Sequence, residues 1–170
     1  MYVFFLKNKN IVQRKQMIKG SHNSMSYLKP LKKFYRWFHF LYRCQSKDIE
    51  KQYEFNVRLF DIHIYRNDRG KGCFKYGNVI YNAFSFYEPF NFLNKMKDCY
   101  VNLVLEETIG DSKKEGIKEI EDKFIWYCNS LQMMYPDIIF IGGYREFDGK
   151  VLYEFKDKLK NNEYILIDFV

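Results

Sequence analysis

The chain has 170 residues, of which 47% are hydrophobic and 20% aromatic, a composition that excludes intrinsic disorder and suffices for one domain with a real core. The formal net charge is +7, and the first 60 residues hold 13 Lys and Arg against 3 Asp and Glu, whereas the rest hold 15 against 18. A basic front half suits an anionic partner, such as a phospholipid surface, a phosphorylated substrate or nucleic acid. A solvated basic helix face explains it equally well.

The first structural elements surround a polar loop at residues 19–27, which contains His22, one of three histidines. Apolar residues then recur with a helical period, and Pro30 suits the first turn of a helix. The apolar stripe consists of Leu28, Leu31, Phe34, Tyr35, Phe38, Leu41 and Tyr42, and the other face carries Lys29, Lys32, Lys33, Arg36 and Arg43. We predict an amphipathic basic helix that packs on a sheet, with an anionic membrane surface as the alternative partner.

Further along, strands and helices alternate. Seven segments are predicted strands: the apolar opening of residues 1–6 and residues 57–65, 73–81 (broken at Gly77), 100–106, 137–141, 151–155 and 163–170. We predict three further helices: a short one with Ser46 as its N-cap, one at residues 85–98, and one at residues 112–134 with Ser112 as its N-cap. The buried stripe of the last helix is predicted to be Ile117, Ile120, Phe124, Cys128 and Leu131. This order predicts an α/β fold with a largely parallel sheet in a single domain spanning residues 1–170.

The cysteines and the apolar runs bear on metal binding and location. The four cysteines, Cys44, Cys73, Cys99 and Cys128, form no Cys-x-x-Cys pair, so we expect reduced, mostly buried thiols and no zinc site. No apolar run reaches the length of a membrane span, and the opening run is too short for the core of a signal peptide. We therefore expect a soluble cytoplasmic protein without a transmembrane segment, with secretion by another route left open.

Polar residues gather at or just beyond the carboxyl ends of the predicted strands, which is where α/β barrels carry their catalytic residues. They are His22, Asp61, His63, Glu106 and Asp168. Asp61 and His63 are two positions apart on a strand, so their side chains should share one face. His39 lies on the aromatic helix and is expected to pack rather than to bind a ligand.

Two blocks of sequence resemble a known family. The first block is Gly20-Ser21-His22-Asn23-Ser24, and the second is Gln52 followed by Val57-Arg58-Leu59-Phe60-Asp61-Ile62. Together they are similar to the catalytic X-type domain of phosphatidylinositol-specific phospholipase C. Tyr76-Gly77, Leu105-Glu106 and Ile167-Asp168-Phe169 stand where that family has its later blocks. The resemblance implies a TIM-barrel-like phosphodiesterase fold. Because the segment from Gly143 to Glu163 is shorter than in the family, the barrel is expected to be shortened or incomplete.

The resemblance implies a phosphoric diester hydrolase that cleaves a phosphoinositide-type lipid or a related glycerophosphodiester. His22 matches the general base, Asp168 the carboxylate that orients it, and Asn23 and Asp61 the positions that hold Ca²⁺ in the metal-dependent branch. The implied catalytic set is His22, Asp61, Asp168 and Tyr76, and the implied substrate-binding set is Asn23, His63 and Arg58. The partners implied are a phospholipid or phosphorylated small molecule and the surface of an anionic membrane.

Three residues depart from the family pattern. Tyr76 replaces the second histidine, which acts as the acid, and a phenol is a weaker acid at neutral pH. His63 replaces the arginine of the metal-independent branch, and Asn56 replaces a glycine, a mild change because asparagine tolerates left-handed backbone.

Two hypotheses follow from these departures. A divalent cation, Ca²⁺ or Mg²⁺, could bind Asn23, Asp61 and Glu106, with His63 as a fourth ligand. Alternatively the domain uses no cofactor and is a catalytically impaired module that binds a phospholipid headgroup, with His63 and Tyr76 simply filling the barrel interior. Nucleic-acid binding through residues 28–43 is a third reading that no RNA-binding motif supports.

Overall fold

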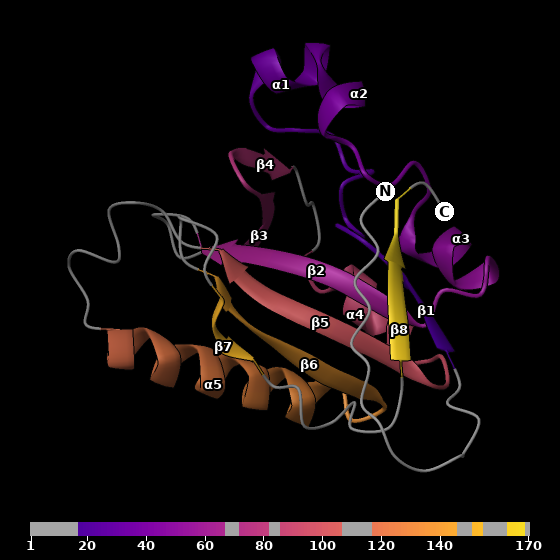
Figure 1. Ribbon diagram of the computed structural model, residues 1–170. Coiled ribbons are helices and arrows are strands. Elements are labelled where there is room, and N and C mark those ends of the chain that lie inside the picture. Colours follow the sequence, from indigo (N-terminus) through magenta and orange to yellow (C-terminus); the bar gives the residue numbers. More distant parts are fainter. Residues whose placement is uncertain are drawn as a thin grey trace.

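The computed structural model describes residues 17–66, 72–81, 86–106, 117–145, 151–154 and 163–168, and Figure 1 shows how these segments are arranged. The strands are β1 (Met17–Ser21), β2 (Leu59–Arg66), β3 (Gly72–Tyr76), β4 (Val79–Tyr81), β5 (Cys99–Glu106), β6 (Ile138–Arg145), β7 (Val151–Glu154) and β8 (Glu163–Ile167). The helices are α1 (Lys33–Trp37), α2 (His39–Tyr42), α3 (Ile49–Glu54), α4 (Glu88–Leu93) and α5 (Ile117–Met134). The alternation of strands and helices confirms an α/β fold.

The strands form one mixed sheet in the order β4-β3-β2-β5-β6-β7, and β1 joins it by pairing with β2 and with β8. The pairs β1–β2, β1–β8, β2–β5 and β5–β6 are parallel, whereas β2–β3, β3–β4 and β6–β7 are antiparallel. Within the described segments no pairing joins β8 to β7 or β4, so this sheet is open. The prediction of a largely parallel sheet is therefore corrected to a mixed one, and a closed barrel is not observed.

One side of β2 is paired at both ends but not in the middle. Leu59 and Phe60 pair with β1, and Ile64 to Arg66 pair with β3. On the other side, β2 pairs with β5 from Leu59 to Ile64. The segment Asp61–His63 thus has a neighbouring strand on one side only. This gap between β1 and β3 leaves room for other groups to reach the backbone of β2.

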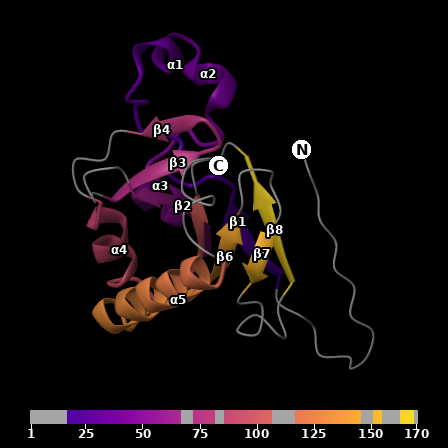
Figure 2. The same ribbon diagram turned by 90° about the vertical axis from the view of Figure 1, so that its left-hand side faces the viewer.

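The alternation of side chains along β2 divides the sheet into two faces. Phe60, Ile62 and Ile64 belong to the main hydrophobic core, together with residues of α4 and α5 such as Phe90 and Leu131. Leu59 lies on the opposite face in a smaller cluster with Ile18 and Ile141, with Tyr100 packed against it. Seen along the sheet edge, α3, α4 and α5 all lie on the same side of the sheet (Figure 2). The helices therefore cover one face, and the face that carries Leu59 is left for the polar side chains of β2.

The aromatic segment 31–42 differs from its prediction. In place of one helix packed on the sheet, two short helices, α1 and α2, meet at Phe38, and neither contains a buried residue. They project from the body of the molecule beyond β4 (Figures 1 and 2). The apolar period correctly indicates helical structure, but the predicted buried face is not observed, because apolar residues such as Phe34 and Leu41 are exposed.

The remaining differences are mostly at element ends. The N-cap of α3 is Asp48, whose carboxylate accepts from the backbone N–H of Lys51 at 2.9 Å, rather than Ser46. The break at Gly77, with φ of 54°, is a tight turn that makes β3 and β4 an antiparallel hairpin. Of the predicted stripe of α5, Cys128 and Leu131 are buried as expected. The predicted strand at residues 1–6, the N-cap Ser112 and the side chains of the other stripe residues lie outside the described part.

No helix within the described ranges is long and apolar enough to cross a membrane.

Candidate active site

The loop after β1 carries His22 and is fixed by hydrogen bonds from distant elements. The amide of Gln45 donates to the carbonyl of His22 at 3.0 Å, and that of Gln52 donates to the carbonyl of Ser24 at 2.8 Å. The N–H of Ser24 donates to the carbonyl of Asp61 at 2.8 Å, so the loop fills the gap beside β2. The position of His22 is thus set by the packed body of the domain rather than by the loop alone.

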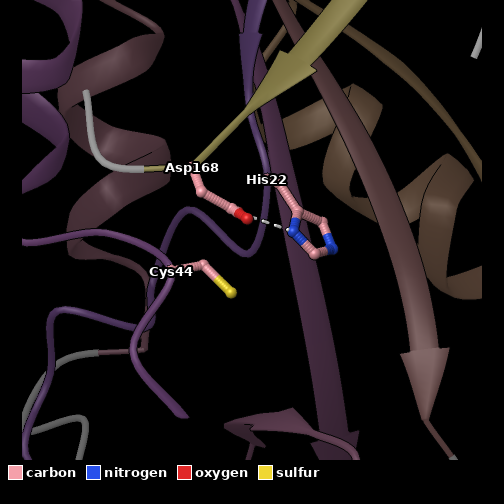
Figure 3. A group of neighbouring side chains, drawn as sticks. All are labelled: His22, Cys44 and Asp168. Carbon is pink, nitrogen blue, oxygen red and sulfur yellow. Dashed lines mark hydrogen bonds and ion pairs between the residues drawn. The ribbon is translucent and has the colours of Figure 1, made fainter. Parts of the chain in front are cut away.

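His22 and Asp168 form a hydrogen-bonded pair. β1 and β8 are parallel, with Ser21 opposite Ile167. The residues that follow them, His22 and Asp168, therefore lie at the same end of the sheet. Nδ1 of His22 lies 2.9 Å from Oδ1 of Asp168 (Figure 3). Because a carboxylate accepts, Nδ1 carries the proton, and Nε2 points away from Asp168 and is left as the nitrogen that can exchange protons (Figure 3).

The surroundings of His22 favour its charged form. Its contact with the side chain of Cys44 raises the pKa, burial opposes this, and the carboxylates of Asp61 and Asp168 raise it further, to about 9. At pH 7 only about one His22 side chain in a hundred is therefore neutral. In the free protein, the ring is a cation near neutral pH and a base only under more alkaline conditions.

A second, buried histidine lies between two carboxylates. Nε2 of His63 lies 3.3 Å from Oδ2 of Asp61, and its Nδ1 lies 2.6 Å from Oε1 of Glu106. Each ring nitrogen faces a carboxylate oxygen, an arrangement that favours the doubly protonated imidazolium form of the ring. Burial alone would lower the pKa of His63, but Asp61 and then Glu106 outweigh it and raise the pKa to about 9. The three side chains form a buried ionic row with a fixed positive centre.

Asp61 remains ionised because its oxygens accept several hydrogen bonds. Oδ2 accepts from the backbone N–H of Asn23 at 3.1 Å, and Oδ1 accepts from the amide of Asn102 at 2.7 Å. Burial alone would raise the pKa of Asp61, but His63, then His22 and the Asn23 N–H hold it well below its usual range. Asn102 is directly opposite Asp61 in the parallel pairing of β2 and β5, which explains how it reaches this carboxylate.

The phenol of Tyr76 is engaged in hydrogen bonds inside the domain. Its hydroxyl accepts from the N–H of Met25 at 3.0 Å and donates to the carbonyl of Asp61 at 3.3 Å. Burial, reinforced by the charge of Asp61, raises the pKa of Tyr76 well above its ordinary value. The ring packs on His63, with centroids 4.8 Å apart. Tyr76 thus fills the gap beside β2 and ties the β3–β4 hairpin to the His22 loop.

A pocket of about 260 Å³ brings these groups together. It is lined by His22, Asn23, Tyr42, His63, Tyr76, Gly77, Val79 and Glu106. Two histidines with raised pKa values therefore face the same cavity, from the loop after β1 and from β2. The positive charge of the two rings is balanced by the carboxylates of Asp168, Asp61 and Glu106, which lie against them.

The residues expected to hold a divalent cation do not fit one. The imidazolium of His63 already lies between the carboxylates of Asp61 and Glu106, where a metal bridging them would have to sit. The side-chain amide of Asn23 donates to Sγ of Cys44 at 3.2 Å, so it is directed at that sulfur. A protonated histidine thus takes the position and the charge of the cation.

Arg58, expected to bind substrate, lies elsewhere. Its guanidinium donates to the carbonyls of Tyr53 and Val57 at 2.9 and 2.8 Å and stacks over the Tyr53 ring. Arg58 precedes β2 and therefore lies at the amino end of that strand, whereas His63 lies near its middle. Nε2 of His39 donates to the carbonyl oxygen of Ser26 at 2.9 Å, which is a structural contact.

Sequence reasoning missed two polar residues of the site. Asn102 was recognisable, since an asparagine inside an apolar strand next to the strand of Asp61 is a polar residue in need of a partner. Cys44 gave no signal, because it lies 21 positions from Asn23 and belongs to no spacing motif.

Comparison with known proteins gives one structural similarity to report. No family profile matches the sequence, and no curated protein matches it. Among solved structures, the fold is similar to phosphatidylinositol-specific phospholipase C from Listeria monocytogenes, with 15% sequence identity and a TM-score of 0.47. The match covers 88% of this chain but 57% of the Listeria chain. A similarity at this level does not establish family membership.

Proposed function

We propose that residues 1–170 form a single domain with phosphoric diester hydrolase activity of the phospholipase C type, acting on a phosphoinositide-type lipid or a related glycerophosphodiester. The observation that carries the proposal is the pairing of His22 with Asp168 at a pocket whose wall also holds the cationic His63. The resemblance of the His22 and Asp61 sequence blocks to that family supports the same reading.

His22 is the general base of this proposal. Asp168 accepts the Nδ1 proton and fixes the ring, so Nε2 can take the proton from a hydroxyl that attacks the phosphorus. The attacking group is a hydroxyl of the substrate headgroup or a water molecule. The phosphorus–oxygen bond to the leaving group breaks, and the leaving oxygen takes its proton from solvent. The proton transfer to His22 needs the ring in its neutral form. Because the pKa of His22 is about 9, that form becomes abundant only at alkaline pH.

We assign His63 the role of the positively charged group in the pocket wall, with its charge largely balanced by the carboxylates of Asp61 and Glu106. Its two N–H groups are committed to Asp61 and Glu106, so it acts through its field rather than through a direct hydrogen bond. A hydrogen-bonded imidazolium cannot move, which keeps the charge in place as negative charge develops on the phosphoryl oxygens. In the phospholipase C family that the sequence resembles, an arginine or a bound metal ion supplies this positive charge.

The exposed aromatic segment 31–42 suits contact with an anionic phospholipid surface. Phe34, Trp37, Phe40 and Leu41 are all more than half exposed, and Trp37 is 82% exposed. Lys29, Lys32, Lys33 and Arg36 are exposed in the same segment or just before it. Apolar rings with interspersed cations match the interfacial layer of an anionic bilayer. Tyr42, at the end of α2, also lines the pocket, so the segment would bring the pocket to the lipid headgroups.

The test is a hydrolysis assay on phosphatidylinositol vesicles and on soluble glycerophosphoinositol, at pH 8.5, with EDTA or with added Ca²⁺. We expect water-soluble inositol phosphate to be released with or without Ca²⁺, and His22→Ala to lower the rate by about 10²–10⁴-fold. The proposal fails if neither substrate is cleaved under any of these conditions.

A headgroup-binding module is the second candidate, and one observation favours it. The Tyr76 proton is committed to the Asp61 carbonyl and both ring nitrogens of His63 face carboxylates, so neither of these pocket residues is free to protonate the leaving group while His22 acts as the base. Two cationic histidines can still bind a phosphorylated headgroup at neutral pH. This candidate predicts that vesicles containing phosphatidylinositol bind the protein without turnover, and that binding survives in His22→Ala with reduced affinity.

A further inference from the structure

The sulfur of Cys44 lies beside the His22–Asp168 pair, on the side of the ring that carries Nδ1 (Figure 3). One ligand atom from each of His22, Cys44 and Asp168 lies within 4.8 Å of the others. Cys44 belongs to the segment after α2, whereas the other two residues follow β1 and β8. The fold thus assembles, from three separate segments, a thiol, an imidazole and a carboxylate around one point.

We propose that His22, Cys44 and Asp168 form a binding site for Zn²⁺ or a similar borderline transition-metal ion. Thiolate, imidazole and carboxylate together are a ligand set for zinc, whereas Ca²⁺ and Mg²⁺ prefer oxygen ligands alone. The site is distinct in chemistry and in residues from the Asp61 and Glu106 carboxylates, which already enclose His63.

The distance between His22 and Asp168 is close to the distance between two ligand atoms of one metal ion. In a tetrahedral zinc site with bonds of about 2.0–2.3 Å, neighbouring ligand atoms are about 3.3–3.8 Å apart. Nδ1 of His22 and Oδ1 of Asp168 are 2.9 Å apart, so they need to separate by only about half an ångström when the ion replaces the shared proton. The Asp168 side chain is 41% exposed and can rotate to allow this.

A neighbouring side chain already supports the sulfur as a ligand. The amide of Asn23 donates to Sγ of Cys44 at 3.2 Å, which holds the sulfur in place beside His22. Such hydrogen bonds to ligand atoms orient metal ligands and strengthen their binding. With three protein ligands, the fourth position of the ion is open to water or to an anion from the pocket side.

Metal binding would change what His22 can do. An ion bound at Nδ1 leaves the remaining ring proton on Nε2, so the ring can no longer accept a proton from a substrate. Zinc is therefore expected to inhibit the proposed hydrolase. The metal site itself does not depend on that activity, and it is tested by binding alone.

The experiment is a titration of the full chain, reduced and freed of metal by a chelator, with Co²⁺ as the spectroscopic probe and Zn²⁺ as its competitor. We expect one Co²⁺ per chain, an absorption in the near ultraviolet from a sulfur–cobalt bond, and displacement by stoichiometric Zn²⁺ but not by excess Ca²⁺. Cys44→Ser should abolish the absorption. Cys44→Ser and Asp168→Asn should each weaken metal binding by at least about 100-fold, since loss of even an outer partner of a metal ligand lowers metal affinity by about 10–100-fold.

The matched control is Cys73→Ser, which removes another reduced, partly buried thiol outside the cluster and should leave the titration unchanged. Circular dichroism and thermal melting check that each variant is folded. If the wild type binds no Co²⁺, or if Cys44→Ser shows the same absorption and affinity, the metal site is refuted while the hydrolase proposal is untouched. If Cys44→Ser is unfolded, Asp168→Asn decides the question: unchanged affinity in that variant refutes the site.

Discussion

The Nδ1 atom of His22 lies 2.9 Å from Oδ1 of Asp168, although the two residues are 146 positions apart in the sequence. The parallel pairing of β1 with β8, in which Ser21 is opposite Ile167, places both side chains just beyond the same end of the sheet. A carboxylate in this position fixes the tautomer of the ring and favours its charged form. The reactivity of His22 is therefore linked to the strand pairing that closes this side of the sheet.

Removal of the Asp168 charge should weaken this control. In Asp168→Asn we expect a lower pKa of His22, because one of the groups that raise it is gone. The value of kcat/KM should fall, but by less than the 10²–10⁴-fold expected on loss of the base itself. Titration of the His22 ring by NMR measures the pKa directly. Asp137→Asn, at another exposed carboxylate, is the control and should change neither quantity.

The pH dependence of the reaction follows from the raised pKa of His22. Only the neutral ring can accept a proton, so kcat/KM should rise about tenfold per pH unit from pH 7 and level off near pH 9. A profile measured between pH 6 and pH 10 checks this. A rate that is already constant above pH 6.5 would show that His22 titrates normally or is not the base.

The stability of the fold should also depend on pH through His63. Its folded pKa, about 9, is above the ordinary value of 6.5, so its contribution is fully present below pH 6.5 and is lost as the pH rises through 9. The free energy of unfolding should fall by up to about 3 kcal/mol over this range. His22, which is partly exposed, should add less. Urea unfolding at pH 6.5 and pH 9 measures the difference, and an unfolding free energy that stays flat or rises contradicts the imidazolium assignment.

Tyr76 allows a separation of structural and catalytic roles. Its hydroxyl bridges the Met25 N–H and the Asp61 carbonyl, so Tyr76→Phe should cost about 1–3 kcal/mol of stability, because it leaves the buried Met25 N–H unpaired and leaves the Asp61 carbonyl with the Ser24 N–H as its partner. The rate should change by less than about threefold. If Tyr76 is instead the acid that protonates the leaving group, the rate falls by 10²–10⁴-fold. Denaturant unfolding and steady-state rates on the same variant distinguish the two roles.

Contact with a membrane is tested at the aromatic segment 31–42. Trp37→Ala should weaken binding to anionic phospholipid vesicles by about tenfold or more, because a buried large side chain is worth about 1.5–3 kcal/mol. Trp126→Ala is a matched control, since Trp126 is 69% exposed but lies on α5, far along the chain from this segment. Vesicle sedimentation measures both. Equal losses in the two variants would indicate non-specific adsorption.

Parts of this arrangement could be predicted from the sequence because they depend on local periodicity. The two-residue spacing of Asp61 and His63 puts both on one face of a strand, and the structure shows them in contact. Asn56 has a left-handed backbone, with φ of 63°, in line with the tolerance of asparagine for that conformation.

Other parts depend on pairings that no local pattern encodes. The antiparallel hairpin at Gly77 turns what looked like one broken strand into two strands, and it joins the antiparallel pairs β2–β3 and β6–β7 in making the sheet mixed. The position of Cys44 beside His22 depends on how the segment after α2 packs on the loop after β1. The helical period likewise did not indicate that Trp37, which lies outside the predicted apolar stripe, is 82% exposed.

The most direct test of the central claim is chemical rescue of His22→Ala by imidazole, with release of inositol phosphate from phosphatidylinositol vesicles as the readout. If His22 is the base in the pocket, imidazole should restore part of the activity in a saturable manner. The pH dependence should then move from near 9 toward the ordinary histidine range of about 6.5, because free imidazole lacks the carboxylates that surround His22. Activity in His22→Ala equal to that of the wild type, with no effect of imidazole, would contradict the account.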